Sequence, residues 1–309
     1  MPLNTISQDI LKTLAYFDYF GYPLTNEDIC SFAGNPYCQS QVDETLDELT
    51  KDKTIFKLDE FYSLQNKHNL ADKRRKGNHM AVKQIAIAKK AAKLISRFPF
   101  VETVAVSGSL SKHYADDKTD IDFFIITKAN RLWIARTLMH LFKKLTYISG
   151  KQHWFCMNYY VDELGLEIPE KNIFTAMEIV TLLPMEGLIH FKKFKEANTW
   201  ANDFFPAHPI ASNAEKEIEK SFICKCLEKI FNSKAGGIFD KWLMTVTDKR
   251  WKKKTAKGKL NANNAKVGMM VSRHFSKPDP KNFQPKVLQQ YDTRVKNLLQ
   301  STHQATITL

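Results

Sequence analysis

Residues 107–123, SGSLSKHYADDKTDIDF, carry the most informative pattern in the chain. A Gly108-Ser109 pair follows the run VETVAV, and Asp120 and Asp122 stand at the start of the apolar run FFIIT. Both runs are short and rich in β-branched or aromatic residues, which predicts two buried strands. Because side chains alternate along a strand, the two aspartates are expected on one face, with Cα atoms about 7 Å apart.

Two carboxylates at the rim of a buried strand repel each other unless a cation lies between them. Carboxylate oxygens suit Mg²⁺, and two such ions about 3.5–4 Å apart can hold the attacking and leaving oxygens of an in-line displacement. The N–H groups of a Gly-Ser turn and the Ser109 hydroxyl suit phosphate oxygens, and Lys112 adds positive charge one turn later. A lone Asp-x-Asp or Gly-Ser pair is common in surface turns, but the two in this order predict a phosphoryl- or nucleotidyl-transfer site.

The flanking sequence predicts an α/β (α+β) fold with its core in residues 67–168. The predicted order is a helix over 80–98, a strand over 101–107, a turn with a short helix, a strand over 121–127, a helix over 131–145 and a strand over 154–161. The strand over 121–127 is apolar on both faces, which is typical of a central strand. We therefore expect a mixed sheet with flanking helices.

These motifs resemble the polymerase-β-like nucleotidyltransferase superfamily. Residues 106–109 match its apolar-residue, Gly, Ser pattern, and residues 119–123 match its Asp, apolar, Asp pattern. The resemblance covers residues 80–165 and implies that Asp120 and Asp122 hold metal, while Gly108, Ser109 and Lys112 bind the phosphates of a nucleoside triphosphate. It also implies Mg²⁺, two ions in the usual case, as the cofactor.

The chain departs from the superfamily pattern at two places. Many small members continue the Gly-Ser pair with Ala-Arg-Gly and place Ser before the first Asp, whereas this chain has Ser111, Lys112 and His113, and then Thr119. The resemblance also implies a third carboxylate on the next strand, where this sequence reads HWFCMNYYVDE.

If the strand register sets Asn158 opposite the aspartate pair, the third acid has become an amide, which can supply a ligand oxygen but cannot act as a base. Asn158 is therefore a candidate catalytic position, and a buried amide that satisfies backbone groups is the alternative. Asp162, Glu163, Glu167 and Glu178 are the other candidates for the third acid.

Residues 1–66 predict a winged-helix-like domain. Helical spacing over 7–20, 25–34 and 39–52 precedes a small hairpin in TIFKLDEFYSL, and Thr25 with Asp28 is typical of a helix start. The third helix would read DNA in such a domain, but acids dominate its outward side, which favours a packing or partner-binding role. These acids are Asp43, Glu44, Asp47 and Glu48.

Residues 169–309 predict a helical C-terminal region. The segment SRHFSKPDPKNFQPK contains three prolines and is predicted to be an ordered loop. A basic segment, residues 249–259, holds seven Lys or Arg residues. It is either a solvated helix face or a contact surface for the phosphates of nucleic acid or another substrate.

Composition limits the class of protein. A net charge of +13, from 46 Lys+Arg against 33 Asp+Glu, favours polyanionic partners such as nucleotides or nucleic acid. The apolar runs are shorter than the ~18 residues of a membrane span, so none is expected. The five scattered cysteines predict reduced thiols in a cytoplasmic protein.

Three functions follow from the sequence. The first is a Mg²⁺-dependent enzyme that moves a nucleoside monophosphate from a nucleoside triphosphate to an acceptor, which can be a small molecule, a protein or a nucleic acid. The second is a catalytically impaired nucleotide-binding module, because the third carboxylate is not identified. The third is a winged-helix DNA-binding regulator.

Overall fold

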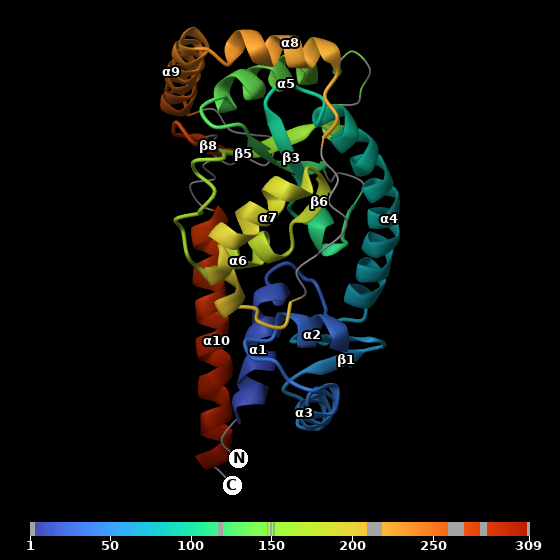
Figure 1. Cartoon of the computed structure of the whole chain (residues 1–309). Helices are drawn as coiled ribbons and strands as arrows, with labels where there is room; N and C mark the ends of the chain where they lie inside the picture. Colours follow the sequence, from blue (N-terminus) through green and yellow to red (C-terminus); the bar gives the residue numbers. More distant parts are fainter. Residues whose placement is uncertain are drawn as a thin grey trace.

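A six-stranded mixed sheet lies at the centre of the molecule (Figure 1). The computed structural model describes residues 4–116, 120–146, 148, 150, 152–208, 218–258, 269–278 and 283–307. The strand order is β6-β3-β4-β5-β8-β7, with β4 and β5 parallel and the other neighbours antiparallel. The strands are β3 (Val101–Val106), β4 (Asp122–Thr127), β5 (Cys156–Asp162), β6 (Leu183–Glu186), β7 (Met269–Val271) and β8 (Phe275–Pro278).

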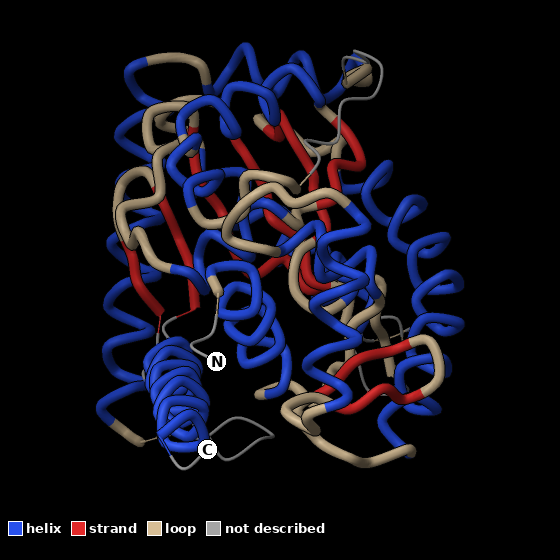
Figure 2. The backbone as a smooth tube through the Cα atoms, turned by 90° about the horizontal axis from the view of Figure 1, so that it is seen from below, coloured by secondary structure: helices blue, strands red, loops and turns tan. Residues whose placement is uncertain are grey.

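The N-terminal segment contains the three helices and the hairpin that the sequence predicts. At the start of the second helix, Thr25 and Asp28 form a reciprocal capping box, so two backbone N–H groups at this end are satisfied. The hairpin lies apart from the central sheet (Figure 2). The elements are α1 (Thr5–Asp18), α2 (Asn26–Phe32), α3 (Gln39–Lys51), β1 (Phe56–Leu58) and β2 (Phe61–Ser63).

Helices cover both faces of the sheet. The long helix α4 begins at Asn69, before the predicted start at residue 80, and ends at Ile95 ahead of Pro99. The remaining helical elements are η1 (Leu110–Lys112), α5 (Leu132–Thr146), η2 (Gln152–Trp154), α6 (Ile173–Val180), α7 (Leu188–Ala197), η3 (Thr199–Asp203), α8 (Phe222–Phe231), α9 (Lys234–Ala256) and α10 (Phe283–Ile307).

Strand β4 is buried on both faces, as its apolar sequence predicts. Phe123 and Ile125 join a core with residues of α4 and α5, whereas Phe124 and Ile126 join a second core on the opposite face. The second core also contains residues of α1, α6 and α7, so the N-terminal helices share one hydrophobic core with the sheet. This continuity fixes α1 relative to the start of β4.

The predicted helical C-terminal region is wrong in part, because β6, β7 and β8 lie within it and belong to the central sheet. These strands have only three or four residues, and prolines stand in β6 and at the end of β8, so their sequence signal is weak. The segment predicted as an ordered loop contains β8. The division at residues 66/67 and 168/169 stays a prediction, although one sheet contains strands from both sides of the second boundary.

The last helix, α10, runs beside α1 (Figure 1). The rings of Tyr16 and Tyr291 pack edge to face with centroids 6.1 Å apart, and Arg294 Nε lies 3.0 Å from Asp18 Oδ2. Among the described helices, none combines the length and the hydrophobicity that a membrane-spanning segment requires. All five cysteines are free thiols.

Candidate functional site

The turn between β3 and η1 approaches the start of β4 closely. Gly108 has a φ of +70°, and a β-carbon built on it would lie 3.0 Å from Asp122 Oδ2. Glycine is therefore required here both for the backbone conformation and for the close approach. The Ser111 hydroxyl donates to the Gly108 carbonyl over 2.8 Å and closes the turn.

Asp120 and Asp122 lie in different environments. Asp122 begins β4, whereas Asp120 precedes the strand and is half-exposed, and its Oδ1 lies 2.5 Å from His153 Nδ1. Burial raises the pKa of the Asp122 carboxyl to about 7, and the negative charges of Asp120 and Glu178 add to the rise. The site therefore concentrates negative charge that the described protein groups do not fully compensate.

The side chain of Asn158 reaches Asp122, although the strand register pairs Asp122 with Cys156 and not with Asn158. A bulge in β5 separates the pairs Phe123–Met157 and Phe124–Tyr159, and Asn158 is the extra residue. Its Nδ2 donates to Asp122 Oδ1 over 2.5 Å, while its Oδ1 accepts from the Cys156 thiol over 3.1 Å. The third position beside the aspartate pair is thus an amide that donates to a carboxylate.

Three of the other candidate acids lie elsewhere. Asp162 is fully buried and accepts from the backbone N–H of Asn130 and of Leu164. Glu163 accepts from the N–H of Ala129 and lies 3.0 Å from His190 Nε2. Glu167 forms an exposed ion pair with Lys171 on the surface. These contacts give the three carboxylates structural roles away from Asp122.

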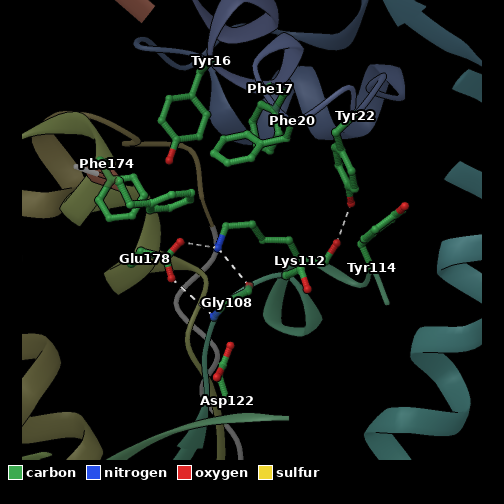
Figure 3. Close-up of a pocket in the computed structure, with 12 residues that line it drawn as sticks. Tyr16, Phe17, Phe20, Tyr22, Gly108, Lys112, Tyr114, Asp122, Phe174 and Glu178 are labelled. Carbon is green, nitrogen blue, oxygen red and sulfur yellow. Dashed lines mark hydrogen bonds and ion pairs between the residues drawn. The ribbon is translucent and has the colours of Figure 1, made fainter. Parts of the chain in front are cut away.

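Glu178, on α6, is the candidate acid that reaches the site. Its Oε1 lies 2.8 Å from Lys112 Nζ, and its Oε2 accepts from the Gly108 N–H over 3.4 Å (Figure 3). Lys112 Nζ also donates to the Gly108 carbonyl over 3.1 Å. The two groups expected to hold phosphate, the Gly108 N–H and the Lys112 ammonium, are therefore both engaged by one carboxylate.

A cavity of about 410 Å³ opens above this turn. Its floor contains Gly108, Ser109, Lys112, Asp122 and Glu178. Aromatic side chains form most of its remaining lining, and Figure 3 shows them surrounding the Lys112 ammonium. They are Tyr16, Phe17, Phe20, Tyr22, Tyr114, Phe174 and Phe283.

A second cavity, of about 620 Å³, shares the polar residues Gly108, Asp122 and Glu178 and the rings of Phe174 and Phe283 with the first. It extends between α6, β5 and α10 and is lined by Asn158 and Lys277 among others. Both volumes lie within the ~300–1,000 Å³ range of small-ligand pockets. Two cavities that meet at one set of polar groups provide room for two reactants.

The aromatic side chains that line the first cavity, hereafter called the aromatic wall, were not expected from the sequence, and neither was the Asp120–His153 contact. The run AYFDYFGY, residues 15–22, holds five aromatic residues, more than one buried helix face requires. That density is a signal that could have pointed to a second role for α1. The Asp120–His153 contact has no comparable signal, because the two residues lie on separate segments.

The donor set at Asp122 suits Mg²⁺. No group of three or more His, Cys, Asp or Glu side chains in the described ranges is arranged to hold a metal ion. Mg²⁺ is nevertheless commonly held by one or two carboxylates, with substrate phosphates and water completing its shell. A cation would favour the ionised form of the half-buried Asp122, which desolvation and two neighbouring carboxylates disfavour.

Two parts of the chain bear on nucleic-acid binding, the third helix α3 and the basic segment at residues 249–259, and they lie far apart (Figure 1). The four acids of α3 named above are exposed. The basic segment forms the end of α9, which ends at Ala256, and the turn that follows at Lys257 and Gly258. Lys259 and the motif residue Thr119 lie outside the described residues. Figure 1 places α3 and α9 at opposite ends of the molecule, so they do not form one continuous surface.

Comparisons of this chain with protein families, with curated proteins and with solved structures returned no match.

Proposed function

We propose that the protein is a Mg²⁺-dependent nucleotidyltransferase that moves a nucleoside monophosphate from a nucleoside triphosphate to an acceptor hydroxyl. The main observation behind the proposal is that a phosphate-type turn meets the half-buried carboxylate of Asp122 at one cavity. Gly108 lies so near Asp122 that a β-carbon at this position would be 3.0 Å from its Oδ2, and Lys112 lies on the same floor.

The residues of the floor, together with Asp120 two positions before Asp122, have distinct tasks in this reaction. The Gly108 N–H, the Ser109 hydroxyl and the Lys112 ammonium bind the β- and γ-phosphates, which leave as pyrophosphate. Asp120 and Asp122 hold the metal, which when bound neutralises phosphate charge and aligns the reacting oxygens. The acceptor occupies the second cavity, whose lining includes Asp122 and Asn158.

Glu178 takes over part of the role of the missing third acid. Asn158 cannot accept a proton from the acceptor hydroxyl, because an amide is not a base. The Glu178 carboxylate borders both cavities and is released from Lys112 once phosphate binds there. It is then the described carboxylate best positioned to accept that proton.

A nucleotide-binding module without turnover is the second candidate. It is favoured by the amide at position 158 and by the carboxylate that already engages the phosphate-binding groups. In that case nucleotide binding would persist and transfer would be absent.

The test is transfer of label from each α-³²P nucleoside triphosphate, with Mg²⁺, to the components of a cell extract. We expect a labelled product with the wild type and none with Asp122→Asn. The circular dichroism spectrum of Asp122→Asn should match that of the wild type, which verifies that the variant folds. Full transfer by Asp122→Asn would overturn it. Metal-dependent nucleotide binding without transfer to any extract component would favour the second candidate.

A further inference from the structure

The wall of the first cavity differs in chemistry from its floor. Tyr16 and Phe17 belong to α1, Phe20 and Tyr22 follow it, and Phe174 comes from α6. Phe20 is 39% exposed although the neighbouring Tyr16 and Phe17 are buried. A large aromatic ring left open beside a polar floor is a binding surface for a flat apolar group.

Helix α6 joins the wall to the floor. Phe174 and Glu178 are four residues apart on this helix, so their side chains lie on the same face, one turn from each other. Figure 3 shows Phe174 beside Tyr16 and Glu178 beside Lys112 on the same side of the cavity. A ligand that joins a flat ring to a chain of phosphates fits this arrangement.

We propose that the aromatic wall binds the base of the nucleotide, so that the N-terminal helices form half of the nucleotide site. The inference rests on the proposed function, because it takes the floor as the phosphate subsite. It assigns a role in substrate binding to a segment whose sequence predicts a winged-helix-like domain.

The wall presents mostly ring faces, and its polar groups are the hydroxyls of Tyr16, Tyr22 and Tyr114. The Tyr22 hydroxyl is already used, because it donates to the Lys112 carbonyl over 2.5 Å. Stacking on aromatic faces tolerates any base, since every base has a π-face, whereas selection requires hydrogen bonds to the base edge. We therefore expect the site to accept all four ribonucleotides, with affinities that follow stacking strength.

The test measures the dissociation constants of ATP, GTP, CTP, UTP and inorganic triphosphate, each with Mg²⁺, by calorimetry. The variants are Phe20→Ala, Phe174→Ala and Phe20→Trp, and Phe222→Ala is the matched control, because Phe222 is an 80% exposed aromatic residue on α8. Melting temperatures of all variants verify that each one folds.

We expect Phe20→Ala or Phe174→Ala to weaken nucleotide binding by roughly five- to 100-fold, the usual effect of removing a stacking ring. Inorganic triphosphate should bind these variants as it binds the wild type. Phe20→Trp, which retains a ring, and Phe222→Ala should stay within about twofold of the wild type for nucleotides.

Two results would overturn the inference and leave the proposed function standing. One is unchanged nucleotide affinity in both alanine variants, and the other is inorganic triphosphate that binds the wild type as tightly as the nucleotides do. A wild type that binds no nucleotide with Mg²⁺ would overturn the proposed function itself, and the inference with it.

Discussion

Glu178 holds Lys112 by an ion pair of 2.8 Å between Oε1 and Nζ, and the same carboxylate accepts from the Gly108 N–H. In the proposed function these two donors bind phosphate, whereas in the structure they contact the Glu178 carboxylate. Under the proposed function, nucleotide binding must therefore displace Glu178, because this carboxylate occupies the proposed phosphate subsite.

Glu178→Gln should tighten the binding of inorganic triphosphate measured without metal. Loss of the negative charge removes the competition for Lys112, and a partly exposed ion pair of this kind is worth about 1 kcal/mol, or roughly fivefold in affinity. Calorimetry checks this. Glu167→Gln is the control, because Glu167 forms a surface pair with Lys171 at the same distance of 2.8 Å. Weaker binding by Glu178→Gln would show that Glu178 does not compete with phosphate.

Asp122→Asn should stabilise the metal-free protein above neutral pH. The folded pKa of Asp122, raised by burial to about 7, lies above its unfolded value of 3.8. The protonated form is therefore favoured by folding, and its contribution to stability is complete below pH 4 and is lost as the pH rises through 7. An asparagine keeps the neutral state at every pH, so the gain at pH 8 should be roughly 1–3 kcal/mol after discounting for residual solvent.

The measurement is urea unfolding with EDTA at pH 5 and pH 8, for the wild type, Asp122→Asn and the exposed control Asp47→Asn. The difference between wild type and Asp122→Asn should grow from pH 5 to pH 8, and Asp47→Asn should follow the wild type. A difference that stays constant or shrinks with pH would contradict the assigned burial of this charge.

Tyr22→Phe should weaken nucleotide binding several-fold while costing about 1 kcal/mol of stability, the usual effect of one lost hydrogen bond. The Tyr22 hydroxyl holds the Lys112 backbone, and the Arg74 guanidinium stacks 3.5 Å from the centre of the Tyr22 ring. Tyr37→Phe is the matched control, because its hydroxyl donates to Asp9 within the N-terminal segment. Both variants should lose stability in urea, but equal nucleotide affinities would exclude a positioning role for Tyr22.

Asn158→Asp should raise the affinity for Mg²⁺ by about tenfold, a change typical of groups that support metal ligands. The new carboxylate replaces an amide that donates to Asp122 over 2.5 Å, so it should also destabilise the metal-free protein at pH 8 through like-charge repulsion. Asn158→Ala removes the hydrogen bond without adding charge. Metal titration by calorimetry separates the two variants, and equal Mg²⁺ affinities would remove position 158 from the site.

The local parts of the site were predictable because their causes are local. A glycine that must adopt positive φ and two aspartates at the start of an apolar strand are readable from a few consecutive residues, and Gly108 and Asp122 lie as predicted. From the sequence, Asn158 could be assigned to the site only on the condition that the strand placed it beside the aspartates. The bulge in β5 that sets this register depends on pairing with β4 and leaves no mark in the sequence.

The parts of the fold and the site that depend on segments far apart in the sequence could not be predicted from a few consecutive residues. Glu178 was one of several candidate acids, and its selection depends on where α6 packs against the turn, which is a tertiary property. The strands β7 and β8 are too short to show a clear alternation, and they form because β5 offers an unpaired edge. The aromatic residues of α1 look like ordinary core until α6 and α10 complete the cavity around them.

Calorimetric titration with the four ribonucleoside triphosphates, once with Mg²⁺ and once with EDTA, tests the proposed nucleotide site on the wild type, Asp120→Asn and Asp122→Asn. We expect the wild type to bind nucleotide with Mg²⁺ and EDTA to weaken this binding strongly. Both variants should lose the metal-dependent part. Equal binding with and without metal, or full binding by both variants, would contradict a nucleotide site built on Gly108, Lys112 and the aspartate pair.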